Sequence, residues 1–201
     1  KALLEGVREE GLEFLPWNRT SRQLRQRIAF LCRLEPGWPD VSDDALTETL
    51  EEWLAPHLYG LKNGDDLRKL DLTAILAGWL PWDRRMSLDE LAPTHIVVPS
   101  GSRIAIDYSD PEAPVLAVRI QEMFGMKETP RIAGGRVPLT LHLLSPAHRP
   151  VQVTQDLASF WRTAYFEVRK DLKGKYPKHH WPDDPLVATP TRRAGQGRFS
   201  G

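Results

Sequence analysis

The hydrophobic pattern of this chain changes abruptly near residue 93, and that change constrains the fold more than any other feature. Before it, apolar residues recur every three or four positions, which is the spacing of an amphipathic helix. After it, short runs rich in β-branched residues alternate with turns made of Pro, Gly and Ser. Helices followed by strands, rather than alternating with them, predict an α+β fold.

Residues 1–81 are expected to form a small helical subdomain of four short helices. Proline or glycine separates the helices, because proline cannot continue a helix. The expected helices cover about residues 2–15, 18–34, 43–55 and 66–80. Residues 82–93 then form a connector that carries a short helix over 87–91.

Residues 94–176 are expected to form a short-stranded antiparallel sheet packed by a long helix. The expected strands are 95–98, 103–108, 115–120, 139–144 and 151–154. Residues 103–108 alternate polar and apolar side chains, as a half-buried antiparallel strand does. Gly134 and Gly135 can adopt the positive φ angles of a tight hairpin turn. The strand lengths leave open whether the sheet closes into a small barrel.

Residues 155–173 are predicted as one long helix that Thr154 caps and Gly174 ends. Projection at about 100° per residue separates two faces of this helix. The apolar face, which should pack on the sheet, consists of Leu157, Trp161, Ala164, Val168 and Leu172. The opposite, cationic face consists of Arg162, Phe166, Arg169, Lys170 and Lys173.

The cationic face indicates contact with single-stranded RNA, because Lys and Arg bind phosphates and an exposed phenyl ring can stack on a base. Arg136 and Lys178 would extend it if their segments face the same way. The alternatives are a solvated helix face, favoured in part by cations near a helix C-terminus, and a surface that docks on another domain or protein. Residues 177–201 are basic and rich in proline, and we expect an extended or disordered tail.

The net charge is zero, but its distribution is uneven. Residues 1–92 hold 12 Lys and Arg against 17 Asp and Glu, and residues 93–201 hold 15 against 10. Such an asymmetry is typical of a polyanion-facing end, or of two domains that attract one another.

Catalytic and metal chemistry find little support in the sequence. A phosphate-binding loop needs glycines followed by Lys and Ser or Thr, but the one Gly-Lys step, Gly174 to Lys175, is followed by Tyr176. His179 and His180 stand near two aspartates without the spacing of metal ligands, and the single cysteine cannot form an internal disulfide. We therefore expect no catalytic residue, cofactor or metal in this chain. No apolar run reaches the roughly 18 residues of a membrane span, so a cytoplasmic location is expected.

Several long strings resemble the C-terminal domain of HrpB, a family of bacterial DEAH-box RNA helicases. They are residues 88–95 (LDELAPTH), 98–108 (VPSGSRIAIDY), 139–161, and 176–178 with Trp181 and Pro182. The resemblance covers about residues 3–193. It implies two RecA-like motor domains elsewhere in such a protein, where ATP and magnesium would bind, and it transfers no catalytic residue to this sequence. The partners it implies are RNA, the motor domains themselves or another protein.

Overall fold

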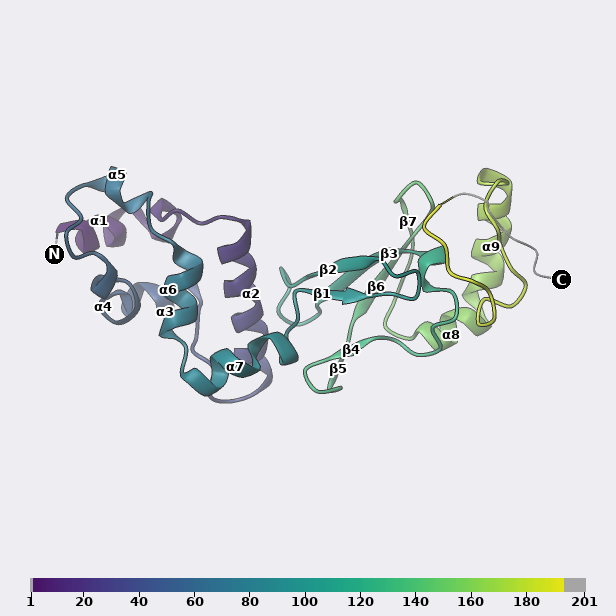
Figure 1. Ribbon diagram of the computed structural model, residues 1–201, viewed down its shortest axis with the longest axis horizontal. Helices are drawn as coiled ribbons and strands as arrows, with labels where there is room; N and C mark the ends of the chain where they lie inside the picture. Colours follow the sequence, from purple (N-terminus) through teal and green to yellow (C-terminus); the bar gives the residue numbers. More distant parts are fainter. Residues whose placement is uncertain (1, 194–201) are drawn as a thin grey trace. The chain divides into compact units, whose positions relative to one another are not determined.

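The computed structural model describes residues 2–193 and divides into two compact units. The helical unit comprises the residues up to Ala92 together with Tyr108–Glu112, and the sheet unit comprises Pro93–Asp107 and the residues from Ala113 onward (Figure 1). Mixed α and β structure is thus confirmed.

The helical unit contains more and shorter helices than the periodicity predicts. They are α1 (Ala2–Glu10), η1 (Leu12–Phe14), α2 (Arg19–Leu34), α3 (Asp43–Glu48), α4 (Leu50–Trp53), η2 (Ala55–His57), α5 (Gly64–Leu67), α6 (Leu72–Trp79) and α7 (Trp82–Leu91). Asn18 caps α2 in a reciprocal pair with Ser21. The helix expected over 66–80 is interrupted, because the Asp71 side chain accepts a hydrogen bond from Ala74 N and starts α6 anew.

Leucine and tryptophan side chains form the core of the helical unit, in which α2 packs against α6. Trp53 is buried and its indole N–H donates to Leu46 O at 2.9 Å. Arg27 is buried in this unit. Its Nε donates to Ala92 O at 2.6 Å and its Nη2 lies 2.7 Å from Asp89 Oδ1, which ties α2 to the end of α7.

The main sheet has the order β1-β2-β3-β6-β7 and is mixed. Its strands are β1 (His95–Val97), β2 (Arg103–Asp107), β3 (Val115–Arg119), β6 (Thr140–Leu144) and β7 (Pro150–Thr154). The prediction of a purely antiparallel sheet is wrong at β3 and β6, which pair in parallel. The chain crosses over between them through η3 (Ile120–Met123) and the hairpin of β4 (Arg131–Ile132) and β5 (Val137–Pro138), as a parallel pair requires. β1 and β7 are the two ends of the strand order, so the sheet is open and no barrel forms in the described part of the chain.

Other predictions about the sheet unit are confirmed. Residues 98–102 turn between β1 and β2, and the buried pattern of β2 alternates. Gly134 and Gly135 both have positive φ angles in the turn between β4 and β5.

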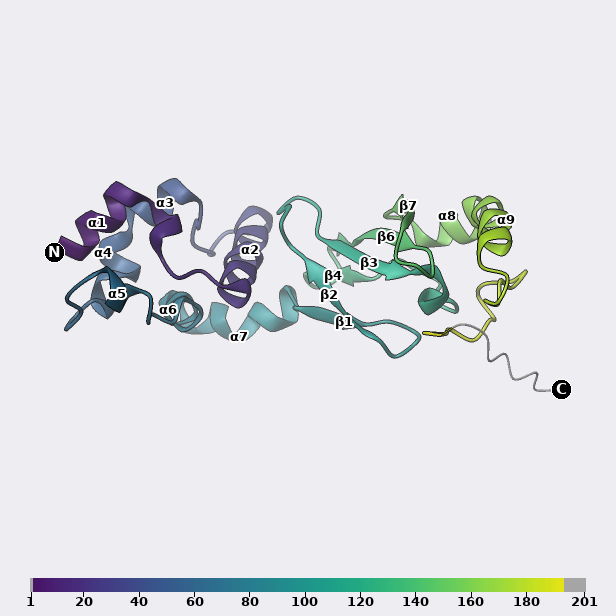
Figure 2. The same cartoon turned by 90° about the horizontal axis from the view of Figure 1, so that it is seen from above.

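The prediction of a single long helix over residues 155–173 is wrong. The chain forms α8 (Leu157–Arg162) and α9 (Ala164–Lys175), and Thr163 between them has φ −125° and ψ −80° (Figures 1 and 2). Asp156 rather than Thr154 caps α8, and Gly174 lies inside α9 instead of ending it. Aromatic rings pack around the break: Phe124, Phe160, Trp161 and Tyr165 are all buried in mutual contact. Burial of these rings stabilises the broken arrangement, and helical periodicity carries no sign of it.

Residues 177–193, which we call the C-terminal segment, are irregular but packed, so the expectation of an extended or disordered tail is wrong for them. Trp181 is buried, and Pro182 O accepts a hydrogen bond from the Tyr165 hydroxyl at 2.7 Å. Two backbone bonds, Gly125 N to Pro185 O at 2.9 Å and Thr191 N to Gln121 O at 3.1 Å, fasten the segment beside η3. The rest of the predicted tail, residues 194–201, lies outside the described residues.

Candidate nucleic-acid interface

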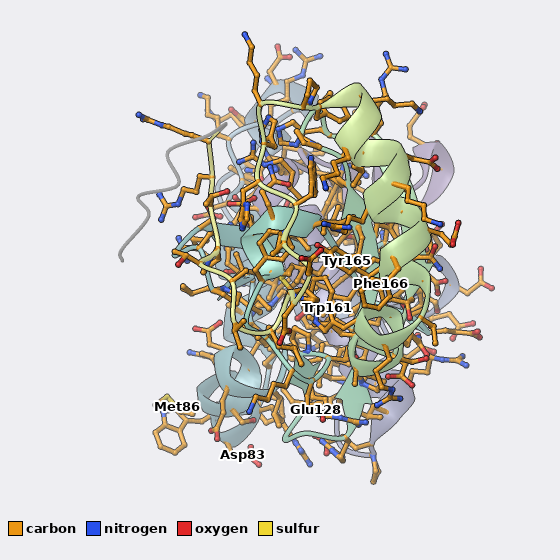
Figure 3. All side chains as sticks on the ribbon, turned by 90° about the vertical axis from the view of Figure 1, so that its right-hand side faces the viewer. Asp83, Met86, Glu128, Trp161, Tyr165 and Phe166 are labelled. Carbon is orange, nitrogen blue, oxygen red and sulfur yellow. The ribbon has the colours of Figure 1, made fainter. Side chains whose placement is uncertain are left out.

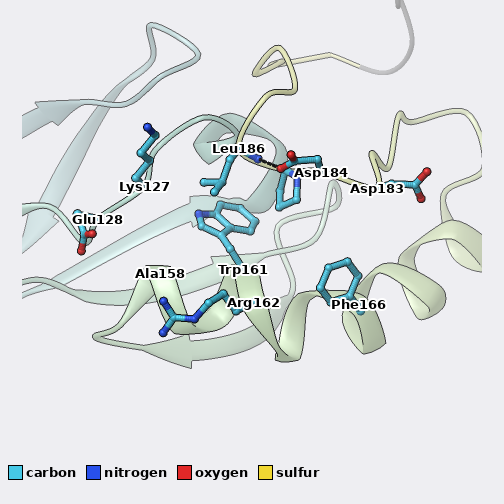
Figure 4. A pocket seen from close by; sticks show the side chains of 10 residues that line it. Lys127, Glu128, Ala158, Trp161, Arg162, Phe166, Asp183, Asp184 and Leu186 are labelled. Carbon is cyan, nitrogen blue, oxygen red and sulfur yellow. Dashed lines mark hydrogen bonds between the residues drawn. The ribbon is translucent and has the colours of Figure 1, made fainter.

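A hollow of about 750 Å³ opens in the sheet unit where α8 and the start of α9 face the C-terminal segment (Figure 4). We call it the aromatic hollow. Its lining residues are Lys127, Glu128, Ala158, Trp161, Arg162, Phe166, Asp183, Asp184, Pro185 and Leu186.

Two aromatic side chains give the hollow its apolar surface. Trp161 stands at its centre (Figure 4), and its indole N–H donates to Met126 O at 2.8 Å. Figure 3 labels Trp161, Tyr165 and Phe166, whose rings contact one another in sequence. The Phe166 ring contacts Tyr165 edge to face with centroids 5.5 Å apart, and 43% of Phe166 remains exposed. Part of the phenyl ring is therefore accessible to a ligand.

Two cations reach the hollow from different parts of the chain. Arg162 ends α8, and Lys127 belongs to the loop after η3. Thr129 positions this loop against α8, since its hydroxyl donates to Gln155 O at 2.7 Å and accepts from Leu157 N at 2.9 Å. Both cations are exposed, and within residues 2–193 neither has an ion-pair partner. Unpaired cations are free to bind an anion.

Three carboxylates also line the hollow, and two of them accept a hydrogen bond within the sheet unit. Asp183 Oδ1 lies 2.6 Å from Arg169 Nη2, and Asp184 Oδ1 accepts from Leu186 N at 3.0 Å. Glu128 is exposed beside Lys127. The hollow thus combines apolar, cationic and anionic groups, which suits a ligand with several kinds of polar group.

The structure separates the residues predicted for the cationic face. Arg162 and Phe166 both line the hollow. Arg169 does not face solvent as predicted: its side chain is 19% exposed, and besides the ion pair with Asp183 its Nε donates to Trp181 O at 3.0 Å. Lys170 and Lys173 are exposed along α9, and Lys170 lies 3.3 Å from Glu167.

Arg136 and Lys178 do not line the hollow. Arg136 is exposed in the turn between β4 and β5, where its Nε donates to Ala133 O at 2.7 Å. Lys178 is exposed at the start of the C-terminal segment. Sequence reasoning missed Lys127, Glu128 and the two aspartates as members of the site. The signal that could have found the aspartates is Trp181 followed by Pro182, an apolar pair that is out of place in a solvated tail.

Burial shifts the pKa of two groups in the sheet unit. Desolvation raises the pKa of the Tyr165 hydroxyl far above its usual value, so this group stays a hydrogen-bond donor. Desolvation, with a smaller contribution from Arg119, lowers the pKa of His179 below its usual value. His179 packs between the rings of Tyr176 and Trp181, with centroids about 6 Å away.

Neither a metal centre nor a membrane span is found among residues 2–193. The histidine, cysteine and acidic side chains of this part form no group of three or more that could hold a metal ion, the pair at 179 and 180 included. Its helices are too short or too polar to cross a membrane.

Comparison with known proteins identifies the relatives of this chain. The family model of the ATP-dependent helicase C-terminal region, HrpB_C, matches residues 53–185. The ATP-dependent RNA helicase HrpB of Escherichia coli (strain K12) is 50% identical over 195 residues, which are 96% of this chain and 24% of that protein.

Two crystal structures have the same fold. One, of the E. coli DExH-box NTPase HrpB, is 49% identical with a TM-score of 0.85 and is matched over 95% of this chain and 24% of its own. The other, of the E. coli DEAH/RHA helicase HrpB, is 47% identical with a TM-score of 0.71 over 89% of this chain and 23% of its own. This chain therefore spans about a quarter of its relatives' length, and it belongs to the HrpB family as its C-terminal helicase region.

Proposed function

We propose that this chain is a non-catalytic accessory region of an HrpB-type, DEAH-box RNA helicase and that it holds single-stranded RNA in the aromatic hollow. The observation that carries the proposal is the exposed Phe166 ring in one hollow with Lys127 and Arg162, two cations that have no ion-pair partner among residues 2–193. ATP and magnesium would bind to the motor domains, outside this chain, since the sequence has no phosphate-binding loop. The cytoplasm stays the predicted location.

Two independent contacts would hold RNA in the hollow. A phenyl ring stacks on any base, which contributes about 1–3 kcal/mol per base in single-strand binding proteins. Lysine and arginine side chains neutralise phosphates and release counterions. Lys170 and Lys173 continue along α9 beyond the hollow and offer further phosphate contacts. Arg169 is excluded from this set, because its guanidinium is engaged with Asp183 and Trp181.

A second candidate function is docking on the motor domains or on another protein. It is favoured by α7, where Trp82 and Met86 are 71% and 63% exposed. These residues are four positions apart and therefore share one face of the helix. Exposed aromatic and methionine side chains are enriched at protein interfaces.

The salt dependence of RNA binding distinguishes the two functions. We expect the chain to bind a single-stranded oligoribonucleotide with an affinity that falls steeply as salt rises. The variant Lys127→Glu/Arg162→Glu should bind at least about tenfold more weakly. Its plot of log affinity against log salt should be shallower by about 1.4, because two phosphate contacts are lost and each contributes about 0.7 to the slope.

The matched control is Arg68→Glu/Lys69→Glu, which reverses two exposed charges in the helical unit. It should bind as the unchanged chain does. Absence of binding at low salt, or equal loss in both variants, would contradict RNA contact in the hollow and favour the docking function.

A further inference from the structure

We propose that the aromatic hollow selects nucleobases that carry an exocyclic amino group, and so prefers cytosine to uracil. This inference rests on the proposed RNA contact and adds a base preference to it. The observation behind it is that hydrogen-bonded carboxylates line the same hollow as the exposed phenyl ring, where phosphate-binding cations alone would be expected.

The hollow has two chemically different ends. Figure 4 shows Lys127 and Arg162 toward one end, with Glu128, and Phe166 with Asp183 toward the other. A nucleotide has the same polarity, because its phosphate is anionic and its base is flat and uncharged. If the phosphate binds Lys127 and Arg162, we place the base on Phe166 and the edge of the base against Asp184.

Each aspartate already has one hydrogen-bond partner before any ligand arrives. Asp183 is bound by Arg169, which is itself anchored on Trp181 O, and Asp184 is bound by the backbone N–H of Leu186. Each of these bonds uses Oδ1, so within the described residues Oδ2 of each aspartate makes no hydrogen bond. Preorganised groups lose little conformational entropy on binding, which raises the selectivity they can supply.

A carboxylate only accepts hydrogen bonds, and this property separates the two pyrimidines. Cytosine carries an amino group at C4, which donates, and acidic side chains accept from this group in nucleic-acid complexes. Uracil carries a carbonyl oxygen at the same position. This oxygen is itself an acceptor, so it cannot form a hydrogen bond with the carboxylate. Adenine carries an amino group too, but a purine also stacks more extensively, so cytosine against uracil is the cleaner comparison.

The test measures binding of twelve-nucleotide oligocytidine and oligouridine to the full chain by fluorescence anisotropy at neutral pH and equal salt. We expect oligocytidine to bind about tenfold more tightly. Asp184→Asn keeps an Oδ1 that accepts from Leu186 N and so preserves the turn, but its amide offers a donor to uracil. In this variant the cytosine-to-uracil ratio should fall to about one or invert.

Glu128→Gln is the matched control at the cationic end, and it should strengthen binding of both oligomers equally by removing a negative charge near the phosphates. Equal binding of both oligomers that still depends on Arg162 would overturn the base preference and leave the proposed function standing. A preference that Asp184→Asn does not change would overturn it as well. If neither oligomer binds, the proposed function itself fails.

Discussion

Arg169 and Asp183 form an ion pair of 2.6 Å that fastens the C-terminal segment to α9. The same guanidinium donates from Nε to Trp181 O at 3.0 Å, so Nε and Nη2 both have partners within the sheet unit. An arginine that helical periodicity assigns to a solvent-facing strip is thus a structural residue, and it fixes one wall of the aromatic hollow.

Arg169→Ala should destabilise the sheet unit by about 2 kcal/mol, because it leaves Trp181 O without its donor and releases the C-terminal segment. Chemical denaturation monitored by tryptophan fluorescence measures the loss. The control is Lys170→Ala, which removes an exposed pair with Glu167 and should change the stability by less than about 1 kcal/mol. Unchanged stability of Arg169→Ala together with weaker RNA binding would show that Arg169 contacts RNA directly.

Phe166→Ala should weaken binding of single-stranded RNA by roughly fivefold to a hundredfold, which corresponds to the loss of one stacked base. The ring is 43% exposed, so its removal should lower the free energy of unfolding only slightly. Phe166→Trp, which keeps a flat aromatic surface, should retain binding. If alanine and tryptophan variants bind equally well in a salt titration, the ring does not stack on RNA.

Arg27→Ala should destabilise the helical unit by about 3 kcal/mol, because Arg27 is buried and its loss leaves Ala92 O without a donor. Asp89→Asn should cost about 1 kcal/mol or less, since the Asp89 side chain is largely exposed and the bond from Arg27 to Ala92 persists. Urea denaturation of the two variants measures the difference. Equal losses would mean that the ion pair, rather than the bond to the backbone, holds α2 to α7.

The stability of the sheet unit should fall as the pH drops from about 7 to 5. The folded pKa of His179 lies below its usual value of 6.5, so the unfolded chain takes up a proton that the folded chain resists. This contribution is fully present above pH 6.5 and is lost as the pH falls toward the folded pKa. His179→Gln, which does not titrate, should show a smaller fall in the urea midpoint between these pH values. An identical fall in both proteins would assign the pH dependence to other groups.

Local pattern was sufficient to predict much of the fold. Helical spacing located α1 and α2, and the alternation of residues 103–108 located β2 with its correct buried face. The parallel pairing of β3 with β6 was not predictable, because it depends on a crossover of twenty residues rather than on either strand. The break at Thr163 was not predictable for a similar reason, because Phe124 from a distant segment stabilises it.

The candidate site was predictable only for residues that lie close together in the sequence. Arg162 and Phe166 lie on the same stretch of chain, and helical periodicity alone predicted that both side chains are exposed. Lys127 and Asp184 reach the hollow through tertiary contacts, namely the Thr129 bonds to α8 and the backbone bond from Gly125 N to Pro185 O. Composition suggested a solvated tail, whereas burial of Trp181 and the bond from Tyr165 to Pro182 outweigh the polarity of the segment.

Ultraviolet crosslinking of single-stranded oligocytidine to the full chain, followed by mass spectrometry of the attached peptides, tests the RNA-holding hollow most directly. We expect adducts on the peptide that contains Phe166, and their loss in Lys127→Glu/Arg162→Glu at equal protein concentration. Adducts confined to the helical unit, or adducts at Phe166 that persist in the double variant, would contradict RNA binding in the hollow.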